Sequence, residues 1–176
     1  MKLYRRSNTP IYGMSVDRKF LIGKLEGYAE VIKEHILKIV TAKRTGNDKF
    51  IDKWIGDISK AIFNASKYTI NGHKRLDVDT YKAELFDTVF GDEKQDMEYH
   101  LEDFQEEYPE YANFDIDDDI VTIMFAIVTE LRNMLPSMIA EWNGDKGIPI
   151  PHTKSKIRPI IQKYISFEVG KDNWCK

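Results

Sequence analysis

The chain has 176 residues, of which 42% are hydrophobic and 31% are charged. This composition supports one sizeable core and excludes a chain that is disordered over most of its length. The single cysteine, Cys175, excludes an internal disulfide framework and a cysteine-based zinc site. The net charge of −3, from 26 Lys and Arg against 29 Asp and Glu, indicates no class of partner by itself.

The sequence carries no apolar run that approaches the roughly 20 residues of a membrane span. Residues 1–10 also lack the apolar stretch of a signal peptide. We therefore expect a cytoplasmic protein that does not associate with a membrane.

Helical spacing of apolar residues begins near the N-terminus. A first helix is expected from a cap at Ser15 to Lys43 or Arg44, because apolar residues follow one another three and four positions apart and Gly46 follows the basic pair. A second helix is expected from a cap at Asn47 or Asp48 to the turn at residues 71–72. Together they predict an antiparallel helical hairpin.

The middle of the chain predicts two further helices. The third begins near Asp79 and ends at Gly91, where a glycine favours helix termination. The fourth covers residues 92–111, with Met97, Leu101 and Phe104 on one side.

The fifth helix, at about 117–142, is the most apolar part of the chain. Apolar residues cover nearly every direction around its axis, so we expect it to be central. Pro136 lies within the pattern and is expected to kink or end the helix. A loop follows at 143–151, and Ser155 is placed to cap a last helix.

These patterns predict an all-α fold. The expected architecture is a single helical domain over residues 1–176, a bundle of about five to six helices with short extended termini. No repeat and no domain boundary is visible in the sequence.

Charge is strongly segregated along the chain. An acidic sub-region at 77–119 holds 17 acidic and two basic residues, a net charge of −15. The remainder holds 24 basic and 12 acidic residues, a net charge of +12. This segregation is the most informative feature of the sequence.

The fourth helix concentrates the negative charge on both sides of its apolar stripe. Like charges at a spacing of four cost a helix roughly 0.2–0.5 kcal/mol per pair, so either the basic part of the chain or a partner must compensate them. The carboxylates expected to face a basic partner are Asp96, Glu98, Glu102, Asp103, Glu106, Glu107 and Glu110.

The density of these carboxylates resembles that of nucleic acid. Residues 92–111 would span about 30 Å of helix and carry nine carboxylates, or one per ~3.3 Å against ~3.4 Å for the charges along one DNA strand. Such a helix would fit a groove built for nucleic acid.

No metal site or cofactor is expected. Asp115, Asp117 and Asp119 fit the start of a calcium loop, but Ile120 replaces the required glycine. Carboxylates at this position favour a cap on the fifth helix instead. The chain also lacks the sequence motifs of nucleotide and serine hydrolases, so a catalytic residue is not expected.

One segment is a candidate for binding anions. It places hydroxyls and cations near a predicted helix N-terminus, where free amides favour phosphate, and its alternative interpretation is a capped helix with solvated lysines. The residues are His152, Thr153, Lys154, Lys156 and Arg158.

Three functional hypotheses follow. The first is a non-enzymatic regulatory protein whose acidic helices engage a basic protein, such as the groove of a nucleic-acid-binding protein, and inhibit it by occupancy. The second is direct nucleic-acid binding through the basic remainder, and the third, less favoured, is a carboxylate-metal hydrolase. The basic residues of the second hypothesis are Lys2, Arg5, Arg6, Lys43, Arg44, Lys74, Arg75, Lys154, Lys156 and Arg158.

Overall fold

A computed structural model describes residues 11–46, 49–69, 76–90, 118–142 and 147–165, together with positions 102, 105, 106 and 109. Its helices are α1 (Ile11–Thr45), α2 (Ile51–Ser66), α3 (Val78–Phe86), the 3₁₀ helix η1 (Asp87–Phe90), α5 (Asp118–Glu141) and α6 (Ile150–Tyr164). The described residues form no strand beyond an isolated bridge between Thr69 and Leu76. The all-α prediction is confirmed. The predicted extended termini and most of the predicted fourth helix lie outside the described residues.

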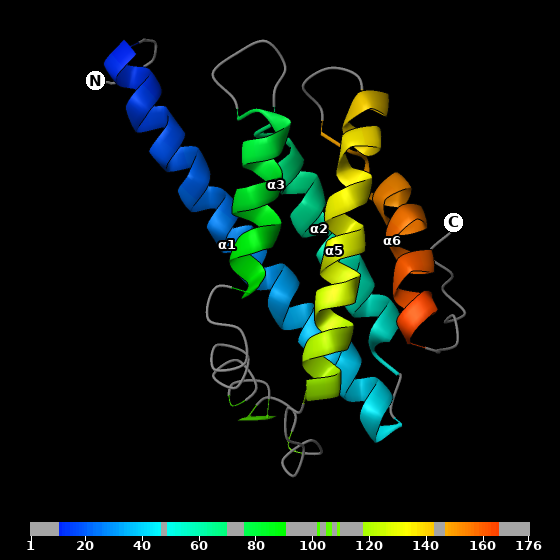
Figure 1. Cartoon of the computed structure of the whole chain (residues 1–176). Helices are drawn as coiled ribbons and strands as arrows, with labels where there is room; N and C mark the ends of the chain where they lie inside the picture. The colour runs from blue at the N-terminus through cyan, green and yellow to red at the C-terminus, as the bar shows by residue number, and fades with distance from the viewer. Residues whose placement is uncertain are drawn as a thin grey trace.

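The long helix α1 organises the bundle. It crosses the molecule obliquely from one end to the other and contacts α2, α3, η1 and α5 (Figure 1). Its buried side, which runs from Leu25 through Ile32 and Ile39 to Ala42, belongs to the same core as Trp54 of α2. Burial of this continuous apolar surface is the main favourable term that holds the helices together.

Helix α5 occupies the range expected of the apolar helix. It contacts α1, α3 and α6, which is compatible with a central position. Ile120, Met124, Ile127 and Leu131 face the core at helical spacing. The opposite side of α5 is more exposed to solvent than the apolar composition of the helix predicted. Its Phe125 side chain is 58% exposed.

The predicted starts of α1 and α2 are wrong. Helix α1 begins at Ile11, before the predicted cap at Ser15. Helix α2 begins at Ile51, and its first turn has no side-chain cap because Phe50 occupies the capping position. Helix α2 also ends at Ser66, before the predicted turn at 71–72, which lies outside the described residues.

The start of α3 follows the rule for helix caps. The side chain of Asp77 accepts a hydrogen bond of 2.8 Å from the backbone N–H of Thr80. This bond lowers the pKa of Asp77, because it stabilises the ionised carboxylate. The helix therefore begins at Val78, one residue before the predicted start.

Prolines act differently from the prediction. Helix α5 continues through Pro136 to Glu141, so of the two expected effects, a kink or an end, Pro136 does not end the helix. Helix α6 begins at Ile150 rather than behind Ser155, with a proline in its first turn. Proline favours that position because it has no N–H to satisfy and its φ is already helical.

One described helix is long and apolar enough to cross a membrane by length and composition. This segment covers Asp119–Glu141, and a third of its tested window is buried in the bundle. Core helices of other bundles meet the same criterion, so the finding is weak evidence for a membrane span.

The connection into α6 is fixed by a close backbone contact. Gly147 has a φ of +86°, and a β-carbon there would lie 3.1 Å from Oγ of Ser66 and 3.2 Å from the carbonyl oxygen of Phe63. The same Ser66 hydroxyl accepts a 2.8 Å hydrogen bond from the N–H of Ile148. The loop that leads into α6 is therefore anchored to the end of α2.

We predict that Gly147→Ala lowers the free energy of unfolding by about 1–3 kcal/mol, because alanine disfavours positive φ and crowds Ser66. The matched control is Gly23→Ala in α1, where nothing lies within 4 Å of the new β-carbon. That change should stabilise the helix by up to about 1 kcal/mol. Urea unfolding of both variants checks the pair, and equal effects would contradict the proposed anchor.

Candidate anion-binding face and adjacent pocket

The described helices fall into two pairs of opposite charge. Residues 49–69 and 147–165, which contain α2 and α6, carry eight basic and two acidic residues, a net charge of +6. Residues 76–90 and 118–142, which contain α3 and α5, carry two basic and eight acidic residues, a net charge of −6. The members of each pair contact one another, so the segregation seen in the sequence persists in space.

Ion pairs join the basic half of the molecule (α2 and α6) to the acidic half (α3 and α5) where α5 meets α6. Lys163 of α6 lies 2.9 Å from a carboxylate oxygen of Glu130, which also accepts a hydrogen bond from the hydroxyl of Tyr164. Nε2 of His152 lies 3.2 Å from a carboxylate oxygen of Glu141. The contact with Lys163 neutralises the carboxylate of Glu130.

Other carboxylates of the acidic half are also paired. Asp119 lies 3.5 Å from Arg44 of α1, and Asp87 lies 3.3 Å from Arg132 of α5. Ion pairs within the chain therefore compensate part of the negative charge of the acidic sub-region. This is one of the two alternatives expected from the sequence.

The basic half is neutralised less completely. Of its two acidic residues, Asp57 pairs with His35 of α1 at 3.2 Å. Among the described residues, no carboxylate forms an ion pair with Lys53, Lys60, Lys154 or Lys156. The surface of α2 and α6 thus keeps an excess of positive charge.

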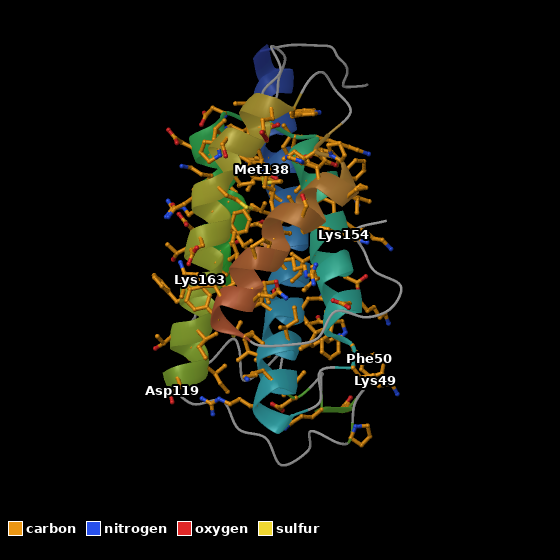
Figure 2. All side chains as sticks on the ribbon, turned by 90° about the vertical axis from the view of Figure 1, so that its right-hand side faces the viewer. Lys49, Phe50, Asp119, Met138, Lys154 and Lys163 are labelled. Atoms are coloured by element: carbon orange, nitrogen blue, oxygen red, sulfur yellow. The ribbon has the colours of Figure 1, made fainter. Side chains whose placement is uncertain are left out.

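Lys154 of α6 lies over a glycine on the face of α2 that carries two of the other lysines. Lys53, Gly56 and Lys60 follow one another at spacings of three and four, which places them on one face of α2. Lys154 extends from α6 over Gly56, where a β-carbon would lie 3.6 Å from its Cε and 3.8 Å from its Nζ. Figure 2 shows α6 between α5 and α2, with Lys154 directed toward α2 and Lys163 toward α5.

The five predicted anion-binding residues have different roles. Thr153 is buried, and its hydroxyl donates to the carbonyl of Pro149 at 2.9 Å. His152 faces Glu141, whereas Lys156 is exposed. Lys154 and Arg158 lie partly buried, one helical turn apart. The structure therefore does not gather the five around one point, and it adds Lys53 and Lys60 of α2 to Lys154.

Only two of the seven predicted partner-binding carboxylates can be placed. Glu102 and Glu106 are helical and exposed, and neither forms an ion pair among the described residues. The other five, which lie outside the described residues, are Asp96, Glu98, Asp103, Glu107 and Glu110. In the described part of the chain, no three His, Cys, Asp or Glu side chains gather in a cluster that could hold a metal ion.

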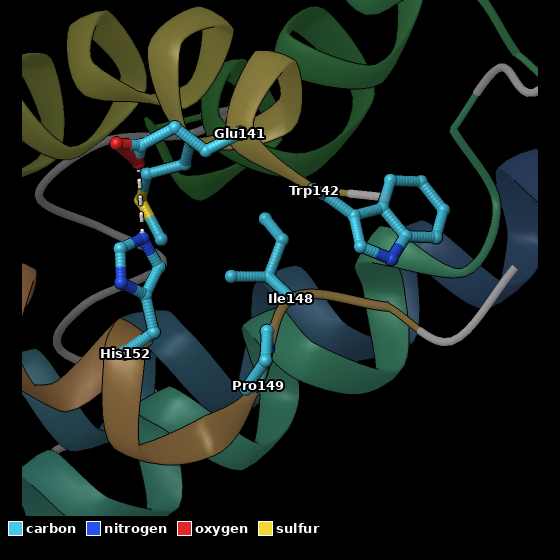
Figure 3. Close-up of a pocket in the computed structure, with 6 residues that line it drawn as sticks. Glu141, Trp142, Ile148, Pro149 and His152 are labelled. Carbon is cyan, nitrogen blue, oxygen red and sulfur yellow. Dashed lines mark ion pairs between the residues drawn. The ribbon is translucent and has the colours of Figure 1, made fainter. Parts of the chain in front are cut away.

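A small pocket lies where α5 ends and α6 begins. It encloses about 240 Å³ and is lined by Met138, Glu141, Trp142, Ile148, Pro149 and His152. Met138 and Ile148 are buried and give the pocket an apolar wall. Figure 3 shows Ile148 between the Glu141–His152 pair and the indole of Trp142.

The polar atoms at the pocket keep unused hydrogen-bonding capacity. Nε1 of Trp142 and Nε2 of His152 are both buried without an aligned hydrogen bond within the structure as described. The contact from His152 to Glu141 is therefore an ion contact at 3.2 Å without hydrogen-bond alignment.

Sequence reasoning missed the α2 contribution and the pocket. The seven-residue spacing of Lys53 and Lys60 was visible, but nothing in the sequence shows that α6 lies across Gly56. The partners Glu141 and His152 stand on different helices, so only the packing of α5 against α6 brings them together.

No protein-family model, curated protein or solved structure matches this chain. The arrangement of its own side chains is therefore the basis for a functional proposal.

We predict that Glu130→Gln lowers the melting temperature at pH 7 by about 1–3 °C. The hydrogen bonds from Tyr164 and Lys163 lower the pKa of Glu130 below its ordinary value of 4.5. A lowered pKa stabilises the fold above the ordinary value, and this contribution is lost as pH falls through the folded-state pKa. The difference between variant and wild type should therefore shrink below pH 4.5.

The control for this prediction is Glu26→Gln, which changes an exposed carboxylate of α1 without an ion pair in the described structure. Thermal melts from pH 3 to pH 7 compare the two variants. A constant difference for Glu130→Gln across this range would contradict the role of its ionised form.

Proposed function

We propose that this protein is a non-catalytic nucleic-acid-binding protein that contacts the phosphate backbone with the face formed by α2 and α6. The observation that carries the proposal is the position of Lys154 over Gly56, on the face of α2 where Lys53 and Lys60 stand, with no carboxylate partner for the three lysines among the described residues. This choice corresponds to the second hypothesis from the sequence. It narrows the binding surface from basic residues along the whole chain to the junction of α2 and α6, and it adds Lys53 and Lys60, which that hypothesis did not name.

The lysine row suits a linear polyanion. Lys53 and Lys60 are seven residues apart, or about 10 Å along the helix axis. This length corresponds to about three phosphates of one strand at ~3.4 Å each. Clustered ammonium groups repel one another, so an anion that lies along the row relieves this repulsion as well as gaining attraction.

We predict that replacing Lys53, Lys60 and Lys154 by Gln weakens binding to nucleic acid and lowers its salt dependence. For every phosphate that is no longer neutralised, the slope of log affinity against log salt should become shallower by about 0.7–0.9. Fluorescence anisotropy with labelled single-stranded and duplex 30-mers between 50 and 200 mM salt measures both quantities.

The matched control replaces Arg18, Lys19 and Lys24, three exposed basic residues of α1, by Gln. It changes the net charge by the same amount, so it should leave most of the salt slope intact if binding is local to α2 and α6. Equal weakening in both triple variants would show that net charge alone governs binding. Absence of binding by the wild-type chain at 50 mM salt would reject the proposal.

A second candidate function remains the engagement of a basic protein by the acidic helices. It is favoured by Glu102 and Glu106, which are four residues apart in the sequence, helical and exposed, and form no ion pair in the described structure. Two like charges at this spacing destabilise a helix, so a basic partner would gain by binding them. Inhibition by occupancy of a nucleic-acid groove is the proposed mechanism.

We predict for this candidate that Glu102→Gln with Glu106→Gln removes a salt-sensitive protein partner while the fold becomes equally or slightly more stable. The gain in stability should be about 0.2–0.5 kcal/mol, since one like-charge pair is removed. Pull-downs at low and high salt, with thermal melts, compare this variant with Glu26→Gln plus Glu30→Gln, which has the same spacing on α1. Reduced stability with an unchanged set of captured proteins would contradict the second candidate.

A further inference from the structure

We infer that a second copy of this chain packs on the exposed face of α1, so that the protein forms an antiparallel dimer through this helix. The face consists of Phe20, Gly23, Lys24, Gly27 and Val31, which recur at spacings of three and four and therefore lie on one side of the helix. The core side chains of α1 lie on the opposite side. The inference is independent of the proposed function, because it uses no residue of α2 or α6.

Two large apolar side chains of this face are exposed to solvent. Phe20 is 58% exposed and Val31 is 37% exposed, and among the described residues Phe125 is the only other large hydrophobic side chain that is exposed. Figure 1 shows the N-terminal half of α1 at the outer edge of the bundle. Because the burial of large apolar side chains is favourable, two of them on one exposed helix face indicate an interaction surface.

The two glycines leave room beside these side chains for another helix. A β-carbon at Gly23 or Gly27 would have nothing within 4 Å, so no contact in the described structure requires a glycine at either position. Glycine inside a helix is destabilising compared with alanine. A second helix gives the missing side chain a use, because the ring of Phe20 would insert into the hole between Gly27 and Val31 of the other copy.

The charges beside this face complement one another in an antiparallel pair. The basic side chains, Lys19 and Lys24, precede the middle of the face, whereas the acidic side chains, Glu26 and Glu30, follow it, and all four residues are exposed. The side chain of Glu30 is 50% exposed, although it also lies 3.4 Å from Lys33 of its own chain.

This order of charges favours a second copy as the occupant. A two-fold axis near residue 25 would bring Lys19 of each copy toward Glu30 of the other, so that every favourable contact forms twice. A parallel copy would instead place like charges side by side. The same axis brings Phe20 of one copy to Gly27 and Val31 of the other, so the charges and the apolar side chains favour the same alignment.

The test measures the molar mass of the full-length chain by sedimentation equilibrium, in a sample free of nucleic acid, from micromolar to near-millimolar concentration. The mass of the wild type should rise from 20.6 kDa toward twice this value. A single pair of helices makes a small interface, so we expect the dimer to form in the micromolar range. Phe20→Gln with Val31→Gln should weaken the association at least about tenfold, because both apolar anchors are lost.

Gly27→Gln separates the packing of the dimer from the stability of the monomer. The new side chain fills the hole that receives Phe20, so the association should weaken at least about tenfold. The monomer should melt at the same or a higher temperature, because a glycine is removed from a helix. The matched control is Phe125→Gln, which changes an α5 side chain of equal 58% exposure and should leave the association unchanged.

A wild-type chain that stays monomeric at every concentration would overturn the inference. A dimer that persists unchanged in the Phe20 and Val31 double variant and in Gly27→Gln would also overturn it, as would equal weakening by Phe125→Gln. Selective loss of the dimer in the α1 variants, with the melting temperature of the monomer maintained, would support it. None of these results bears on the proposed function, because no nucleic acid enters the measurement.

Discussion

Helix α1 lies against two pairs of helices with opposite charge, and this arrangement is the constraint on which the other properties of the molecule depend. Burial of the apolar side of α1 fixes where α2, α3 and α5 pack, and α6 then packs against both α2 and α5. Because α6 is basic and α5 acidic, their contact brings Lys163 to Glu130 and His152 to Glu141. The core thus determines which charges meet.

The neutralisation that results is uneven. Carboxylates of the acidic half find partners on α1, α5 and α6, whereas Lys53, Lys60, Lys154 and Lys156 have no carboxylate partner in the described structure. A protein of nearly zero net charge therefore presents a cationic surface at the junction of α2 and α6. Long-range attraction toward a polyanion depends on such local excess charge rather than on the net charge of the chain.

The sequence predicted the helical class and the approximate positions of the helices, because apolar residues at three- and four-residue spacing report burial directly. Prediction from the sequence failed at the ends of helices, because their positions depend on the segments packed beside them. Ser15 and Ser155 have the chemistry of helix caps, yet α1 and α6 begin before them, at Ile11 and Ile150. The lysine cluster could not be predicted, since it requires that Lys154 cross the surface left open by Gly56. That contact is a property of packing between α2 and α6.

The most direct test of the central claim is a titration of the ¹⁵N-labelled protein with a single-stranded 12-mer, followed by amide chemical shifts. We predict that the chemical-shift changes concentrate on α2 and α6 around Lys53, Gly56, Lys60 and Lys154. These changes should diminish as the salt concentration is raised. Changes concentrated on α3 and the outer side of α5, or no changes at low salt, would contradict it.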